Sequence, residues 1–191
     1  MRIITRANQH SLTSGDCLLN LSVASDIRAA RCTICDPAAF LRDLRIVAAD
    51  YDTHIICFNA DMIAGRVHAA AAVARAVRAF EERVTISNTL EMESLLFAAG
   101  SRQCNIATSF GIHAGENRVY ICCYPQREGV WTALEPLVDI VAENWEMIGP
   151  EKRSLLMKTF AISPEEIAAA GGGGRIVDLV LERVAMLHVT R

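Results

Sequence analysis

The sequence lacks an excess of positive charge, and this absence restricts how the chain could bind nucleic acid. Its 191 residues include 19 lysines and arginines against 22 aspartates and glutamates, which gives a net charge of −3. Proteins that bind nucleic acid unaided through its phosphates are usually basic. Any RNA contact of this chain must therefore be local, or shared with a partner.

Long apolar runs are also missing. Charged residues interrupt every apolar stretch well before the length of about 18 residues that indicates a membrane-spanning helix. The first six residues, MRIITR, lack the apolar segment of a signal peptide. We therefore expect a cytoplasmic protein with no membrane partner.

Signatures of catalysis and metal binding are absent as well. Cys32 and Cys35 form a lone CxxC pair, whereas a zinc site needs a second pair or nearby histidines. The five histidines are scattered, the glycine run 171–174 does not match a phosphate loop, and no serine lies in a GxSxG elbow. The seven cysteines form no disulfide framework. We expect no enzymatic activity, no cofactor and no metal, although a hydrolase or redox enzyme using Cys32 and Cys35 stays an alternative.

Apolar residues make up 52% of the chain, which is enough for one hydrophobic core. We expect a single domain over residues 1–191, of the α/β (α+β) class. Its sheet should be small, mixed or mainly antiparallel, with about five strands packed with seven or eight helices. Residues 53–191 form the core of this prediction, and residues 1–52 supply N-terminal strands and a helix.

Hydrophobic periodicity and turn residues give the expected elements. Strands are expected at residues 1–7, 16–23, 30–35, 53–58 and 118–124. Helices are expected at residues 36–47, 59–80, 88–99, 102–111, 130–142, 150–160, 164–170 and 175–188, with a flexible connector at 171–174. The expected N-caps are Asp36, Asn59 or Asp61, and a capping box from Ser87 and Asn88 to Glu91. Cys122 and Cys123 are adjacent in a strand, so they should face opposite sides of the sheet.

A polar joint between two expected helices is the best candidate binding site. Gly100 is a natural helix-ending residue, and Ser101 would cap a helix over residues 102–111. The N–H groups at such a helix end attract anions. Arg102 adds a bidentate donor for phosphate, and Gln103 can donate to and accept from a nucleobase. The alternative is a plain turn with a solvated arginine.

The last expected helix is apolar on nearly all sides. Ile176, Leu179, Val180 and Leu187 form one stripe, and only a narrow polar strip is left around it. Such a helix is buried on two sides. The second side could be covered by a partner protein, or the helix could lie entirely inside the chain's own core.

Three segments resemble a known family. They are FNADMIAGRVH at residues 58–68, a pattern of Asn88, Glu91 and AAGSRQ at 98–103, and the apolar helix from Ile176 to Leu187. The chain is identified as a member of the family of the smallest, kinase-binding subunit of the KEOPS complex, of archaeal type, which includes the human PRPK-binding protein. Cys104 stands where the family often has isoleucine, and human members lack the Arg-Gln pair.

The resemblance implies a non-catalytic subunit of a complex that makes N6-threonylcarbamoyladenosine in tRNA. Such a subunit docks on and activates the atypical kinase subunit, meets the other KEOPS subunits indirectly and, in archaeal members, binds the 3′ CCA end of tRNA. For tRNA the expected residues are Asn59, Arg66, His68, Ser101, Arg102 and Gln103. For the kinase they are Ile176, Leu179, Val180, Val184 and Leu187. The alternative is a small-molecule-binding regulatory domain that uses the Ser101 helix end for a phosphorylated ligand.

Overall fold

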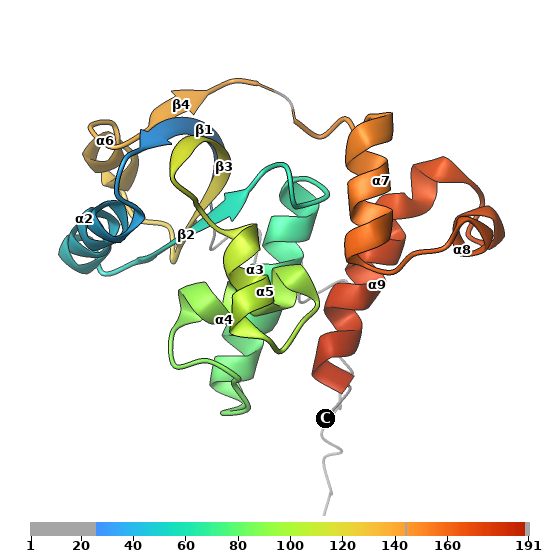
Figure 1. The fold of residues 1–191 in the computed structure, drawn as a ribbon. Helices are drawn as coiled ribbons and strands as arrows, with labels where there is room; N and C mark the ends of the chain where they lie inside the picture. Colours follow the sequence, from blue (N-terminus) through green and yellow to red (C-terminus); the bar gives the residue numbers. More distant parts are fainter. Residues whose placement is uncertain (1–25, 144, 190–191) are drawn as a thin grey trace, which may run out of the picture.

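The computed structural model describes residues 26–143 and 145–189, and the two strands expected at 1–7 and 16–23 lie outside this part. Within it, four antiparallel strands form one sheet in the order β2-β3-β1-β4. Their bounds are Asp26–Ile34 for β1, His54–Asn59 for β2, Gly115–Tyr124 for β3 and Asp139–Val141 for β4. Eight α-helices of the described residues pack around this sheet, which has four strands there where about five were expected. The prediction of a single α+β domain with a mainly antiparallel sheet is confirmed (Figure 1).

The central strand β3 divides the apolar residues into two cores. It pairs with β1 from Asp26 opposite Cys123 to Ile34 opposite Gly115. Because side chains alternate along a strand, Cys122 lies in the larger core on one face and Cys123 in the smaller core on the other. Both thiols are fully buried, and burial raises their pKa values. The expectation that these two cysteines face opposite sides is confirmed.

Most of the helices cover the larger core. They are α3 (Arg66–Glu81), α4 (Leu90–Ala99), α7 (Pro150–Thr159) and α9 (Ile176–Val189), with α5 (Cys104–Ala107), the 3₁₀ turn η1 (Thr108–Phe110) and α8 (Pro164–Ala169) beside them. Ala69, Ala72 and Ala76 of α3 are completely buried, and their small side chains allow close helix packing. In Figure 1, α7, α8 and α9 stand together on one side of the molecule, opposite α2 and α6.

The smaller core lies under α2 (Pro37–Asp50) and α6 (Val130–Leu134). Asp36 begins α2: its Oδ1 accepts hydrogen bonds from Ala38 N–H at 2.8 Å and Ala39 N–H at 3.2 Å. Pro37 occupies the first helical turn, where its missing N–H has no consequence. The predicted cap and helix start are thus confirmed.

The helix expected at 130–142 is wrong beyond its first turn. The helix α6 ends at Leu134, and residues 139–141 instead pair with residues 29–31 of β1 as strand β4. Pro136 has no N–H to donate to the carbonyl of Thr132, so the helix cannot continue through it. The pairing with β1, which only the tertiary structure supplies, then makes the following residues extended.

Two predicted helix starts are also wrong. The helix α3 begins at Arg66 after Gly65, and neither Asn59 nor Asp61 caps it. The helix α4 is capped by Thr89, whose Oγ1 accepts from Met92 N–H at 3.3 Å. The chain therefore runs as a loop over residues 60–65 and 88–89, where the sequence suggested helix.

The C-terminal segments follow the sequence pattern closely. The helix α8 begins with a capping box between Ser163 and Glu166. The glycine run 171–174, expected as a flexible connector, contains a turn with positive φ at Gly171 and Gly172 and enters the 3₁₀ turn η2 (Gly173–Arg175). Across residues 26–143 and 145–189, no helix has the length and apolar character needed to cross a membrane.

Candidate functional site

The β2–α3 loop, residues 59–65, is held by hydrogen bonds within the family-like segment itself. Asn59 Oδ1 accepts from Asp61 N–H at 2.9 Å, and Asn59 O accepts from Met62 N–H at 3.1 Å. Gly65 adopts a φ of +100°, which L side chains rarely reach. The asparagine and glycine of this motif therefore have a structural role in shaping the turn into α3.

His68 connects this loop to helix α4 by hydrogen bonds, and its side chain is completely buried. Its Nδ1 accepts from Ala64 N–H at 3.0 Å, so its Nε2 must carry the proton that is donated to Ala98 O at 3.0 Å. Burial lowers the pKa of His68 to about 4, the hydrogen bond to Ala98 opposes this shift, and Lys152 adds to it. The predicted contact of His68 with RNA does not fit this structure, because both ring nitrogens are used inside the core.

Arg66 lies at the first turn of α3, on the surface. Glu146 accepts from the Arg66 N–H at 3.1 and 3.2 Å, and its carboxylate lies 3.7 Å from Arg66 Nε. An acidic group at a helix N-terminus is stabilising, and Gly65 supplies no side-chain cap. Arg66 also lies over the Tyr120 ring, at 5.9 Å. The Arg66 side chain is half-exposed, but a carboxylate already balances its charge.

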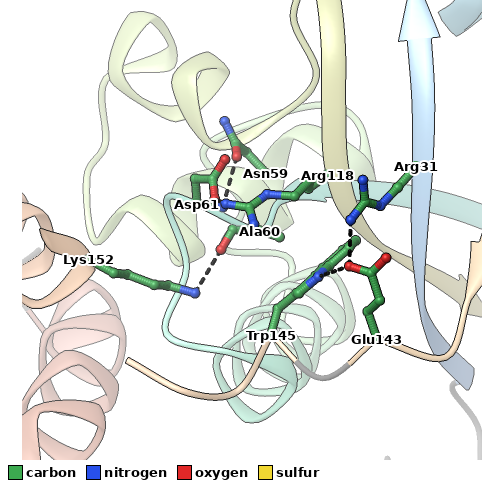
Figure 2. Close-up of polar contacts among 8 residues, drawn as sticks. All are labelled: Arg31, Asn59, Ala60, Asp61, Arg118, Glu143, Trp145 and Lys152. Atoms are coloured by element: carbon green, nitrogen blue, oxygen red, sulfur yellow. Dashed lines mark hydrogen bonds and ion pairs between the residues drawn. The ribbon is translucent and has the colours of Figure 1, made fainter. Parts of the chain in front are cut away.

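A strap of residues 142–143 and 145–149 crosses from β4 to α7 and carries Glu146 (Figure 1). Figure 2 shows how its other side chains are held. Glu143 accepts from Arg31 at 2.6 Å and from Trp145 Nε1 at 2.8 Å. The Trp145 ring meets Tyr120 edge-on at 5.7 Å. These contacts fix the strap against side chains of β1 and β3.

Two further cations flank the β2–α3 loop next to this strap (Figure 2). Arg118 of β3 pairs with Asp61, and its guanidinium lies 5.8 Å from the Trp145 ring. Lys152 of α7 donates to Ala60 O at 2.8 Å, and burial lowers its pKa. Sequence reasoning missed both residues, because each is a single charge in an otherwise ordinary strand or helix. They tie α7 and the sheet to the loop.

The polar joint after α4 differs from its prediction. Gly100 has the expected left-handed geometry, with φ +57°. The helix expected over residues 102–111 is wrong: α5 begins only at Cys104, has four residues, and is followed by η1. Ser101 does not cap it, because Ser101 Oγ accepts from Gln103 N–H at 3.2 Å within the turn. A helix this short does not provide the N-terminal anion site that the sequence suggested.

Arg102 and Gln103 nevertheless remain available at the surface. Both side chains are exposed, and Arg102 has no hydrogen bond or ion pair to any residue that the structure describes. The hydrogen bond from His68 to Ala98 brings the first turn of α3 against the last turn of α4, two residues before Gly100. The two family-like motifs are thus neighbours in space, although no described contact joins Arg66 to Arg102.

The helix α9 turns its predicted contact residues inward. Within the larger core lie Ile176, Leu179, Val180, Val184 and Leu187, each at most 9% exposed. Arg183 anchors the helix by donating to Phe160 O at 3.2 Å and to Glu166 at 2.7 Å. The five residues cannot meet a partner while α9 is packed in this way. The outward side instead presents exposed Asp178, Glu182 and Met186, whereas Val177 and Leu181 are half-buried on one flank, Val177 against the larger core.

A comparison with protein families matches residues 35–188 to the model of the kinase binding protein CGI-121. The chain belongs to the CGI-121 family. This confirms the family predicted from the three motifs, and the matched range covers every element from α2 to α9 except Val189, the last residue of α9. A comparison with curated proteins found no match to the chain.

Membership of the CGI-121 family gives the chain a kinase-binding character, without naming the surface that binds. The family-like motif of residues 58–68 is largely explained by the internal hydrogen bonds of the β2–α3 loop. No group of three or more metal-binding side chains occurs within the described ranges. In the lone CxxC pair, Cys32 is buried and Cys35 is exposed. Burial raises the pKa of the Cys32 thiol to about 11.

Proposed function

We propose that this CGI-121 family chain is the non-catalytic, kinase-docking subunit of a KEOPS-type complex that makes N6-threonylcarbamoyladenosine in tRNA. The family match is the observation that carries the proposal, because the family binds kinases. The absence of a metal-ligand cluster from the described residues is compatible with an accessory role. In this proposal the chain activates the atypical kinase subunit and meets the other subunits through it.

Our proposed kinase surface is the outward side of α9, where exposed Met186 follows Asp178 and Glu182 at helical spacing and half-buried Leu181 lies on the flank. Leu181 is half-buried within the chain, and Met186 is 48% exposed. Apolar side chains in such a position are typical of a helix that a partner covers. Asp178 and Glu182 are exposed beside them, so a kinase surface with basic residues at its rim would complement this face.

A co-purification experiment with the kinase tests this surface. Met186→Glu should abolish co-purification and leave the melting temperature nearly unchanged, because Met186 is 48% exposed. Leu41→Glu on α2, also a partly exposed apolar residue of a surface helix, is the matched control and should keep the kinase. Retention of the kinase by a folded Met186→Glu variant would contradict the proposed surface.

For RNA, we propose that the joint after α4 binds the single-stranded 3′ CCA end of tRNA. Arg102 would contact phosphate and Gln103 a base edge, with Asn59, Arg66 and Ser101 beside them. The exposure of Arg102 and its lack of a partner within residues 26–143 and 145–189 support this role. Recognition of an unstacked end by one cation and a polar side chain also suits a chain of net charge −3.

A mobility-shift titration of tRNA over a range of salt concentrations tests the RNA contact. Arg102→Ala should weaken binding and reduce the slope of log K against log salt by about 0.7, the value of one phosphate contact on a single strand. Arg42 is another exposed arginine, and Arg42→Ala should leave the tRNA affinity and the salt slope unchanged. If tRNA that lacks its CCA end bound as tightly as intact tRNA, the proposed site would be wrong even if the kinase proposal held.

The alternative of a phosphorylated small-molecule ligand at the Ser101 helix end loses its main support. The four-residue α5 does not begin at Ser101, and the Ser101 hydroxyl is occupied by the turn.

A further inference from the structure

A hollow of about 220 Å³ lies beside strand β2, between α2 and α4. The strand contributes three consecutive residues to its lining, Ile55, Ile56 and Cys57. Leu44 and Ala48 of α2 lie with the smaller core, whereas Met92 and Leu95 of α4 pack against the larger core. The hollow is therefore the space left at the sheet edge where the two cores meet.

The interior of this hollow is apolar, and its mouth lies beside α2. The lining residues of β2 and Leu44 are all buried, whereas Leu41 of α2 is 37% exposed. Arg45 follows Leu41 by one helical turn and is exposed as well. A cavity of roughly 150 Å³ can hold a benzene molecule, so this one has room for a phenyl ring with a short tail.

Most polar side chains that line the hollow are already used within the chain. Thr89 caps α4, and Thr108 donates its hydroxyl to Asn105 O at 2.9 Å. The carboxylate of Glu91 lies 2.8 Å from His54 Nδ1, and this hydrogen bond raises the pKa of His54. These groups leave little hydrogen-bonding capacity for a ligand.

Arg45 differs from these residues, because it has no ion pair or hydrogen bond to any residue that the structure describes. It also lines a neighbouring hollow, in which Arg127 pairs with Asp52 at 2.8 Å. The other charges around Arg45 thus compensate one another, and its own positive charge remains. A guanidinium binds a carboxylate through two parallel hydrogen bonds. An apolar interior with such a group at its mouth fits a molecule that has an apolar body and one carboxylate.

From these observations we propose that the hollow beside β2 binds a small monocarboxylic acid whose apolar body has about the size of a phenyl ring. The apolar body lies between α2 and α4, and the carboxylate accepts from the Arg45 guanidinium at the mouth. Burial of the apolar body supplies the affinity, and Arg45 selects acids over neutral molecules of the same shape. In Figure 1, α2 stands on the opposite side of the molecule from α9, so this ligand and a kinase on α9 do not compete.

Methyl NMR of the full chain tests the proposal, with hydrocinnamate as the probe. This acid has a phenyl ring, a two-carbon tail and a carboxylate, and its dissociation constant should be on the order of 0.1 to 1 mM, as suits a ligand of its size. The methyl signals of Ile55, Ile56 and Ile112, which line the hollow, should shift on titration. Those of Ile46 and Ile140, which are exposed outside the lining, should stay in place.

A comparison of the acid with its amide tests the role of Arg45. Hydrocinnamamide has the same shape without the charge, and should bind the wild type about threefold to fivefold more weakly, the effect of one partly exposed ion pair. In Arg45→Gln the affinity of the acid should fall to that of the amide, whose own affinity should not change. Arg42 lies on the same helix outside the lining, and Arg42→Gln should change neither affinity.

Three results would overturn this site. They are unshifted Ile55, Ile56 and Ile112 methyl signals at several millimolar hydrocinnamate, equal shifts of the Ile46 and Ile140 signals, and equal binding of acid and amide to the wild type. Arg45→Gln should retain the kinase and Met186→Glu should retain hydrocinnamate, so failure of the ligand site and failure of the kinase surface can be told apart.

Discussion

Burial of His68 should make the stability of this protein depend on pH in a way that one substitution isolates. In the folded chain its neutral ring bridges Ala64 N–H and Ala98 O, and its pKa is lowered from 6.5 to about 4. A group whose folded pKa is depressed stabilises the fold above its unfolded pKa. This stabilisation is lost as the pH falls from about 6.5 toward about 4, because the unfolded chain takes up the proton first.

The size of the effect follows from these two pKa values. At about pH 8 the imidazole is neutral in both states and contributes no pH dependence. At about pH 5 the unfolded ring is almost fully protonated and the folded ring is not, which destabilises the fold by roughly 2 kcal/mol. His68 is completely buried, so solvent screening does not reduce this figure substantially.

Chemical denaturation of the wild type and of His68→Gln, each at about pH 8 and about pH 5, measures the effect. Glutamine can still donate and accept but does not titrate, so carboxylates that titrate in both proteins cancel in the difference. At about pH 8 the wild type should be more stable than His68→Gln by roughly 2 to 4 kcal/mol, because the variant loses a buried contact. That advantage should shrink by roughly 2 kcal/mol at the lower pH. A difference between the two proteins that is the same at both pH values would refute the buried, neutral assignment of His68.

Three further predictions concern the core, the α3–α4 loop and a surface pair. Val180→Asp should lower the melting temperature by more than 10 °C or prevent folding, because it places an unpaired charge at a fully buried position of α9; a normal melting curve would contradict the inward orientation of this residue. Glu93→Ala should destabilise the chain by roughly 2 to 3 kcal/mol in urea titration, because the buried carboxylate accepts from two backbone N–H groups of that loop; Glu151→Ala, at an exposed position, is its control. In an NMR titration the pKa of His54 should lie above the usual histidine value, because Glu91 accepts its hydrogen bond at 2.8 Å. The pair therefore stabilises the fold at low pH, and this stabilisation is lost as the pH rises through the folded pKa of His54. In Glu91→Gln the His54 pKa should fall, and an unchanged value would show that the pair does not form in solution.

Local signals predicted several parts of the fold correctly. Asp36 and Pro37 mark the start of α2, because a carboxylate acceptor and a residue without an N–H suit the first helical turn. Gly100 ends α4 with φ +57°, where glycine has no Cβ to clash. The alternation of Cys122 and Cys123 between two cores follows from the two-residue period of a strand.

The candidate sites could be predicted less well, because exposure is a property of the packed molecule. His68 follows exposed Arg66 by two positions, yet it lies wholly inside the core. Ser101 has the residue type of a cap, but its hydroxyl is used within a turn, and the helix begins later. The strap that carries Glu143, Trp145 and Glu146 has no sequence signature, because its order comes from side chains of β1, β3 and α3.

The sequence by itself determined the family, the α+β class and most helix and strand positions, since these depend on residue type and on spacing along the chain. The tertiary structure alone decided which apolar face of α9 is buried, because that face is chosen by the helices and strands packed against it. It also decided that residues 139–141 form a strand, since an extended segment is stabilised only by the neighbour with which it pairs. In the same way, the hollow beside β2 exists only after α2 and α4 have taken their places around it.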